Sequence, residues 1–272
     1  MRIVVLGLLF AMLGFAAHAQ SVEANEKACS GYDLEVSVRA CTALISSGAL
    51  SGANLAVAYT DRANSNGKLG QCELAIQDYN AALSLNPNIA EAYNNRGHCY
   101  GQVGRFSEGL ADFNKAIAIG PKAVSYSGRG YIYLKMAQYQ SAISDFQTAV
   151  AMDPSDYKSY DNLGIAYGMV GNQSAAVKSF SSCEAIQPSF ANCYYDKGSS
   201  YLREHQPQLA IKEFDRALAI NPRYLEAFGN RGLAYDLLGL HAQAVSDYRN
   251  ALRLDPANSK LRELLKHDGA AP

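Results

Sequence analysis

The chain has 272 residues, of which 49% are hydrophobic and 18% are charged, and its formal net charge is −1. This composition is typical of a globular protein with enough apolar side chains for a sizeable core. The nearly balanced charge provides no basic field that would attract nucleic acid or acidic lipid, so we expect neither as a partner.

The first 19 residues have the pattern of a secretory signal peptide. Arg2 precedes an apolar run over residues 3–15, and the small residues Ala17 and Ala19 fit a signal-peptidase site. The run is too short for a comfortable membrane anchor. No cysteine follows the cleavage point until Cys29, which argues against a lipoprotein. We expect a mature chain from about residue 20, exported to a bacterial periplasm without stable membrane insertion.

A cap segment, residues 20–55, is predicted to follow the leader. It contains one expected helix over Val36–Gly48, in which Val36, Ala40 and Ala43 are spaced as on one helix face. This helix has no partner in its own segment. We therefore expect it to cover the first of the helix pairs described next.

The rest of the chain repeats one pattern at a fixed period. Six prolines are spaced by 34, 33, 34, 34 and 34 residues, at Pro87, Pro121, Pro154, Pro188, Pro222 and Pro256. A period of this length predicts paired helices that stack as a solenoid. The six predicted repeats are 56–89, 90–122, 123–156, 157–190, 191–224 and 225–257. Residues 258–272 are predicted to form a C-terminal cap helix and tail.

The residue types within one repeat fit two antiparallel helices in close contact. In the second repeat, Tyr93, Gly97 and Tyr100 lie on one stripe of a first helix. Gly109 and Phe113 lie on the matching stripe of a second helix. The glycines allow the helices to approach, and the rings fill the volume beside the contact. We expect these aromatic residues to be packing residues.

The repeated template resembles the tetratricopeptide repeat family. The residues that carry the resemblance in the third repeat are Tyr126, Gly130, Tyr133, Ala142, Phe146, Ala149 and Pro154. The match covers about residues 56–256. The resemblance implies an all-α fold, a right-handed superhelical solenoid of about six helix pairs with capping helices at both ends.

A basic residue in the first helix of a repeat is matched by an acidic residue in the second. The predicted pairs are Arg62–Asp78, Arg96–Asp112, Arg129–Asp145, Lys197–Glu213 and Arg231–Asp247. In the fourth repeat Leu163 and Ser179 take these positions, so base and acid disappear together. We expect structural ion pairs, because a partly buried charge requires its partner. A role of these bases in ligand binding is the alternative.

Six cysteines in a chain expected to be exported indicate disulfides. Cys183 ends one helix and Cys193 lies near the start of the next, antiparallel helix, so the two should be neighbours. No two cysteines have the Cys-x-x-Cys spacing of a redox or zinc site. The predicted pairs are Cys29–Cys41, Cys72–Cys99 and Cys183–Cys193; buried free thiols are the alternative.

Catalytic and metal-binding patterns find no support in the sequence. The histidines beyond the leader lie in different repeats or in the tail, and no phosphate-binding loop is present. We therefore expect a protein that is not an enzyme, with no catalytic residue, no metal site and no cofactor.

The family resemblance implies a groove lined by the first helices of the repeats. The candidate groove residues are His98, Tyr131, Leu134, Ile165, Tyr195, Leu202 and Leu233. Aromatic and aliphatic side chains in a concave surface suit an extended or helical peptide. The alternative is that these residues only fill gaps between helices.

The sequence thus predicts an exported adaptor that binds a protein or peptide partner in this groove. Two other functions stay open. The chain could be the scaffold subunit of a cell-envelope assembly that uses its outer face and ends, or it could capture a small molecule or glycan. The identity of the partner does not follow from the fold.

Overall fold

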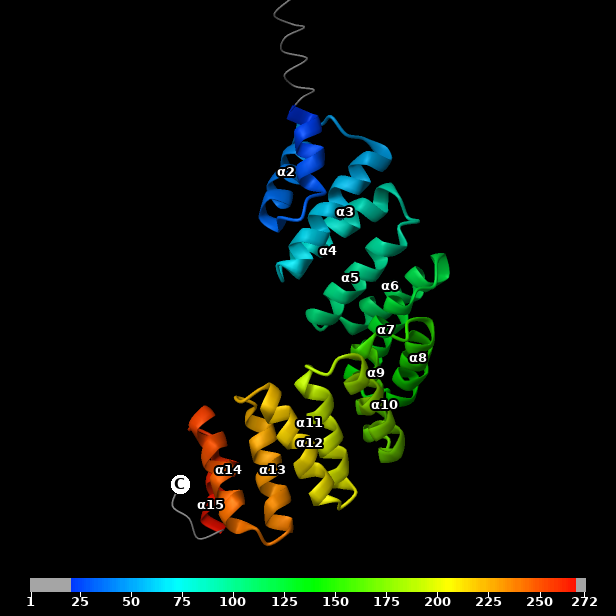
Figure 1. The fold of residues 1–272 in the computed structure, drawn as a ribbon. Coiled ribbons are helices and arrows are strands. Elements are labelled where there is room, and N and C mark those ends of the chain that lie inside the picture. The colour runs from blue at the N-terminus through cyan, green and yellow to red at the C-terminus, as the bar shows by residue number, and fades with distance from the viewer. Residues whose placement is uncertain (1–20, 268–272) are drawn as a thin grey trace, which may run out of the picture. The chain divides into compact units, whose positions relative to one another are not determined.

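A computed structural model describes residues 21–267 of the chain, with side chains to Leu265 (Figure 1). Every regular element in that range is a helix. The predicted signal peptide, residues 1–19, lies outside the described residues. The chain divides into two compact units, unit 1 up to Ile132 and unit 2 from Tyr133.

Unit 1 begins with a helical segment over residues 21–29 and continues as a series of packed helices. These are α2 (Leu34–Ser47), α3 (Gly52–Lys68), α4 (Cys72–Leu85), α5 (Ala90–Gln102), α6 (Phe106–Ile119) and most of α7 (Ala123–Lys135). Each helix from α2 to α5 packs on the next one in the chain. The helix α2 covers α3, the position expected for a cap.

Unit 2 continues the same alternation (Figure 1). Its helices after the end of α7 are α8 (Tyr139–Met152), α9 (Tyr157–Met169), α10 (Gln173–Ile186), α11 (Ala191–Arg203), α12 (Pro207–Ile220), α13 (Leu225–Leu237), α14 (His241–Leu254) and α15 (Ser259–His267). The first helices of successive repeats are also neighbours, since α11 contacts both α9 and α13. The last helix, α15, packs on α14.

Glycine-to-aromatic contacts hold the two helices of several repeats together. A Cβ atom on Gly232 of α13 would lie 2.5 Å from the ring of Tyr248 in α14, and one on Gly164 of α9 would lie 2.5 Å from Phe180 in α10. Both rings are almost fully buried. The predicted close approach of the two helices is therefore observed, and any larger residue would push them apart.

The turns between the two helices of a repeat need a left-handed residue. Gly171 and Gly239 supply it in unit 2, with φ of 81° and 73°. His205 takes the same position between α11 and α12 with φ of 56°. A non-glycine residue there costs about 1–2 kcal/mol, which the surrounding packing offsets. At this turn, tertiary packing therefore overrides the local preference for glycine.

In the part of the chain that the structure describes, no helix has both the length and the apolar character needed to cross a membrane.

Candidate functional site

Two-bond ion pairs join the two helices of several repeats. Arg62 of α3 donates from Nε to Asp78 Oδ2 over 2.8 Å and from Nη2 to Oδ1 over 2.7 Å. The acid is buried and both of its oxygens accept from Arg62, so the pair is engaged within the protein. The same two bonds, each 2.7 Å long, join Arg96 to Asp112 and Arg231 to Asp247.

Lys197 of α11 is shared between two acids. Its Nζ lies 3.0 Å from Glu184 Oε2 and 3.5 Å from Glu213 Oε1. Glu184 belongs to α10 of the preceding repeat, and comparison of positions within one repeat did not reveal it. Burial raises the pKa of Glu184, and the Lys197 ammonium opposes that rise. This base is therefore also engaged within the protein.

Arg129 and Asp145 belong to different units. Their pairing stays a prediction.

Two of the predicted cysteine pairs are disulfide-bonded in the structure. The Cα atoms of Cys29 and Cys41 are 4.7 Å apart, and those of Cys183 and Cys193 are 6.1 Å apart. All four side chains are buried. The first bond ties the helical segment 21–29 to α2, and the second ties α10 to α11.

The third predicted disulfide is not formed. Cys72 and Cys99 are free, buried thiols. The thiol of Cys72, at the start of α4, lies 3.1 Å from the side-chain oxygen of Gln102. Burial and the neighbouring Cys72 raise the pKa of Cys99, so the thiolate that disulfide exchange requires is disfavoured. The facing positions were predicted correctly, but the bond between them was not.

A polar cavity of about 360 Å³ lies between α3 and α5 in unit 1. Asn64 Oδ1 accepts hydrogen bonds from the Tyr79 hydroxyl over 2.6 Å and from Asn95 Nδ2 over 2.9 Å. His98 lines the same cavity and packs edge-on against Phe113, with ring centroids 5.0 Å apart. These amides satisfy one another, which leaves the cavity few polar atoms that need a ligand.

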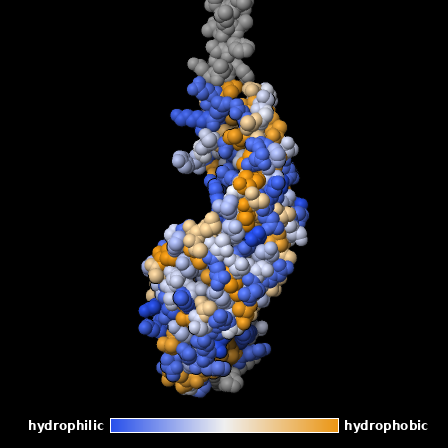
Figure 2. All heavy atoms as spheres, turned by 90° about the vertical axis from the view of Figure 1, so that its right-hand side faces the viewer, coloured by the Kyte–Doolittle hydropathy of each residue, from blue (hydrophilic) through white to orange (hydrophobic). Residues whose placement is uncertain are grey.

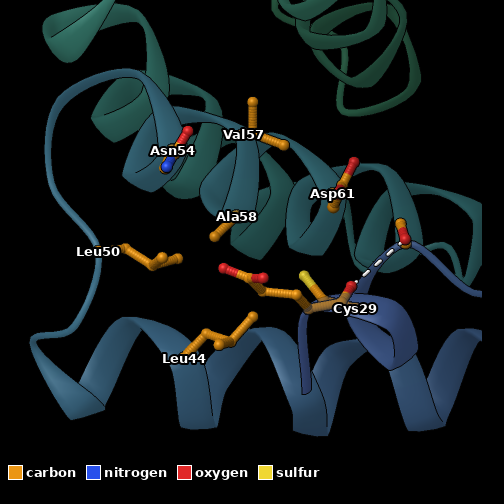
Figure 3. A pocket seen from close by; sticks show the side chains of 9 residues that line it. Cys29, Leu44, Leu50, Asn54, Val57, Ala58 and Asp61 are labelled. Carbon is orange, nitrogen blue, oxygen red and sulfur yellow. Dashed lines mark hydrogen bonds between the residues drawn. The ribbon is translucent and has the colours of Figure 1, made fainter. Parts of the chain in front are cut away.

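A second cavity of unit 1, of about 310 Å³, lies between the 21–29 segment, α2 and α3 (Figure 3). Leu44 and Leu50 point toward its centre, and Asn54 and Asp61 of α3 line its other side. Burial and the charge of Glu91 raise the pKa of Asp61.

Tyr195 of α11 belongs to the first-helix face of unit 2, which we define by Asp161 of α9, Asp196 of α11, and Asn230 and Leu233 of α13 together with Tyr195 itself. Its hydroxyl accepts a hydrogen bond from Asn230 Nδ2 over 3.1 Å. Its ring lies 4.8 Å from that of Tyr224 and 5.9 Å from that of Phe214. Tyr195 therefore packs against two core clusters. Tyr195 is one of the predicted groove residues, but its ring also bridges α11 and α13, which agrees with the alternative that such residues fill gaps between helices.

The other candidate groove residues differ in exposure. Tyr131 of unit 1 is 40% exposed and Leu233 of unit 2 is 41% exposed. Leu134, Ile165 and Leu202 are half-buried. Leu134 packs against the cluster around Ile143 and Phe146, and Leu202 against the one around Phe214. In unit 2, Leu233 is thus the aliphatic member of the set most open to a ligand.

A cavity of about 370 Å³ adjoins Leu233. It lies between α13 and α15, and Tyr195 forms its far wall. Gly229 and Asn230 line it from α13, and Lys260 and Leu261 from α15. The mixture of apolar walls and a few polar groups is typical of binding pockets.

Two acids of the first-helix face have pKa values well above the usual range of aspartate. Asp161 of α9 is only 7% exposed, and its Oδ1 has no hydrogen-bond partner among the described residues. Burial, followed by the charge of Asp196 in α11, raises the pKa of Asp161 to about 7. Burial raises the pKa of Asp196 to about 7 as well, and Arg203 opposes that rise. A carboxylate oxygen of Asp161 also lies within 4.8 Å of the Cys183 and Cys193 sulfurs.

The sequence analysis did not identify this acidic pair. A partial signal was present, since the sixth position of the repeats reads Asp61, Asn95, Gly128, Asn162, Asp196 and Asn230. An acid at this position was therefore visible in the first and fifth repeats. The burial of Asp161 without a donor depends on how three helices meet, and no pattern in the sequence indicates it.

The helix pairs, their period and their glycine-to-aromatic contacts define a helical-repeat protein. Family models agree: one described as TPR repeat matches residues 67–104, and three described as Tetratricopeptide repeat match residues 90–122, 123–156 and 195–259. The chain belongs to the tetratricopeptide repeat family, and the predicted all-α solenoid of helix pairs is confirmed. No curated protein matches the chain.

Solved structures with this fold include several helical-repeat proteins. PilW, described as a widely conserved type IV pilus biogenesis factor, is 18% identical with a TM-score of 0.71, over 78% of this chain and 98% of that one. A tetratricopeptide repeat protein from Parabacteroides merdae is 18% identical with a TM-score of 0.68, over 92% and 99%. YrrB, described as having an unusual peptide-binding site, is 24% identical with a TM-score of 0.57, over 70% and 96%. At these identities the likeness concerns the fold.

Proposed function

We propose that the chain is a non-enzymatic adaptor that binds a segment of a partner protein on the first-helix face of unit 2. The observation that carries the proposal is the combination of Leu233, 41% exposed, with the adjoining cavity of about 370 Å³ walled by Tyr195. A partly rigid ring beside an open aliphatic side chain is a typical anchor site for a peptide. The peptide-binding site attributed to YrrB supports the class of function.

The surface seen in Figure 2 provides weaker evidence for binding than the first-helix face does. On the side seen in Figure 2, hydrophobic residues occur as small patches between polar ones. Scattered apolar residues are normal on a protein surface and do not mark an interface. A cavity with convergent polar groups is a stronger indication of binding.

The test compares two exposed leucines of unit 2 on different helices. Leu233→Glu changes the first-helix face, and Leu209→Glu changes α12, where Leu209 is 44% exposed. Both variants and the unchanged chain would be used to capture partners from a periplasmic extract, with quantitative mass spectrometry. We expect Leu233→Glu to lose partners that Leu209→Glu retains. The reverse pattern would favour the scaffold function, in which the outer face is used.

Capture of a small molecule or glycan is a second candidate, because the cavity beside Leu233 is within the usual size range of ligand pockets. A thermal shift with a metabolite or oligosaccharide panel, in the absence of any protein, would favour it if the shift disappears in Gly229→Phe.

The proposal includes export to an oxidising compartment. It is supported by the leader pattern and by two cysteine pairs at disulfide distance. Non-reducing peptide mapping of the exported chain would detect both bonds. Alkylation of all six thiols would contradict it.

A further inference from the structure

Among the described residues, no base donates a hydrogen bond to either member of the acidic pair Asp161 and Asp196. Lys197, the nearest basic residue in the chain to Asp196, is bonded to Glu184 and Glu213. Lys158 of α9 lies over the ring of Tyr157, with 5.9 Å from Nζ to the centroid. Arg203 acts on Asp196 through its charge, but among the described residues it donates no hydrogen bond to either acid, and its guanidinium lies close to Gly168. Asp161 is left with no cation of its own.

The groups around the pair are acidic and aromatic. Burial raises the pKa of Tyr224, at the start of α13, and the charges of Asp196, Glu226 and Asp161 add to that rise. Tyr195 lies beside it, with ring centroids 4.8 Å apart. A buried carboxylate without a donor is costly, and a second carboxylate nearby adds to that cost. A cation bound between them would remove both costs.

We propose that Asp161 and Asp196 form a pocket for the arginine or lysine side chain of the bound peptide. This rests on the proposed peptide binding to the first-helix face. A guanidinium has five N–H donors and can bond two carboxylates at once. The rings of Tyr195 and Tyr224 supply aromatic faces of the kind on which a guanidinium stacks.

A basic side chain fits this pocket better than a metal ion does. Magnesium and calcium need six or more oxygen ligands. The neighbours of Asp161 are instead the disulfide sulfurs of Cys183 and Cys193, which are not thiolates. A long organic cation needs only one or two carboxylates at its tip, and its stem can pack on apolar groups.

A random peptide library selected on the purified chain tests the proposal. The selected peptides would be measured on the unchanged chain, on Asp161→Asn with Asp196→Asn, and on Leu233→Glu. We expect enrichment of peptides with an arginine or lysine whose binding weakens at least 10-fold in the double asparagine variant. Replacing that basic residue by methionine in the peptide should produce a loss of similar size.

The outcomes separate the two proposals. Peptides that lose binding in Leu233→Glu but not in the asparagine variant, or that contain no basic residue, would overturn the acidic pocket and leave the binding face in place. If no selected peptide depends on Leu233, or the selection yields no binder, the binding face fails and the pocket inference fails with it.

A second measurement needs no peptide sequence. N-acetyl-argininamide, its neutral citrulline analogue, and magnesium or zinc chloride would be titrated into the chain while the Asp161 and Asp196 carboxyl resonances are observed by NMR. We expect a saturable shift with the arginine compound and none with the citrulline analogue. A shift with a metal salt alone, or equal shifts with both organic compounds, would overturn the proposal. Urea unfolding of the double asparagine variant checks that it remains folded.

Discussion

Two aspartates of unit 2 are similarly buried and yet differ in their surroundings. Asp247 of α14 is 3% exposed, and both of its oxygens accept bonds from Arg231. Asp161 of α9 is 7% exposed, and its Oδ1 accepts none among the described residues. A buried charge with its partner is part of the fold, whereas one without a partner indicates a ligand. The contrast between Asp247 and Asp161 distinguishes an aspartate that stabilises the fold from an aspartate that is a candidate for ligand binding.

The largest expected effect on stability comes from removing Arg231, the partner of the paired aspartate Asp247. Replacing Arg231 by Ala should lower the free energy of unfolding by about 3–5 kcal/mol, because Asp247 is then left buried without a cation. Urea unfolding measures the loss. A double-mutant cycle with Asp247→Asn should show coupling between the two residues. If the two losses simply add, Asp247 does not depend on Arg231, and the distinction from Asp161 disappears.

The disulfide beside the unpaired aspartate provides the second test. It closes a loop with a sequence separation of 10, so replacing Cys183 and Cys193 by serine should cost about 3 kcal/mol. Urea unfolding under oxidising conditions measures the change. The control is the serine variant of the free thiols, Cys72 and Cys99. A larger loss in that control would contradict the prediction that the bonded pair contributes more to stability than the two free thiols.

The pH dependence of stability should distinguish the two aspartates next. A carboxyl whose folded pKa is raised stabilises the fold below its unfolded pKa, and that stability is lost as pH rises through the folded value. The pKa of Asp161 rises from near 4 in an unfolded chain to about 7. Unfolding free energy should therefore fall between pH 4 and pH 7.5, by roughly 2–3 kcal/mol in a free chain.

Asp161→Asn should remove part of this pH dependence and make the chain more stable at pH 8, by about 1–2 kcal/mol. The matched control is Asp215→Asn, an exposed acid of α12. Equal pH profiles for the unchanged chain and Asp161→Asn would mean that Asp161 is solvated, and the comparison with Asp247 would fail.

The smallest expected effect concerns the repeat that lacks the ion pair. Leu163→Arg should destabilise, because the residue is buried against Ala142 and Phe146. Adding Ser179→Asp should recover about 1 kcal/mol by restoring the pattern seen at Arg231 and Asp247. Thermal unfolding of the single and double variants measures the recovery. No recovery would indicate that the site has been reshaped around Leu163.

The features repeated along the chain were predictable from sequence. The helix pairs, the glycine-to-aromatic contact at Gly232 and the coupling of Arg96 to Asp112 recur at a fixed period, so the chain supplies its own comparison. Features that occur once were not predictable. Three such features depend on contacts between repeats, which a single-repeat template does not contain. They are the bridging position of Tyr195, the second acid bound to Lys197, and the Asp161 Oδ1 atom that has no hydrogen-bond partner among the described residues.

The pKa values of Asp161 and Asp196 in the free chain test the central claim most directly. A carbon-13 NMR titration of the aspartate carboxyls, assigned through the two asparagine variants, would provide both. We expect each to titrate near pH 7 and to move well below that value when a basic peptide is bound. Titration of Asp161 near pH 4 in the free chain would contradict the account, because a solvated carboxylate needs no cation from a partner.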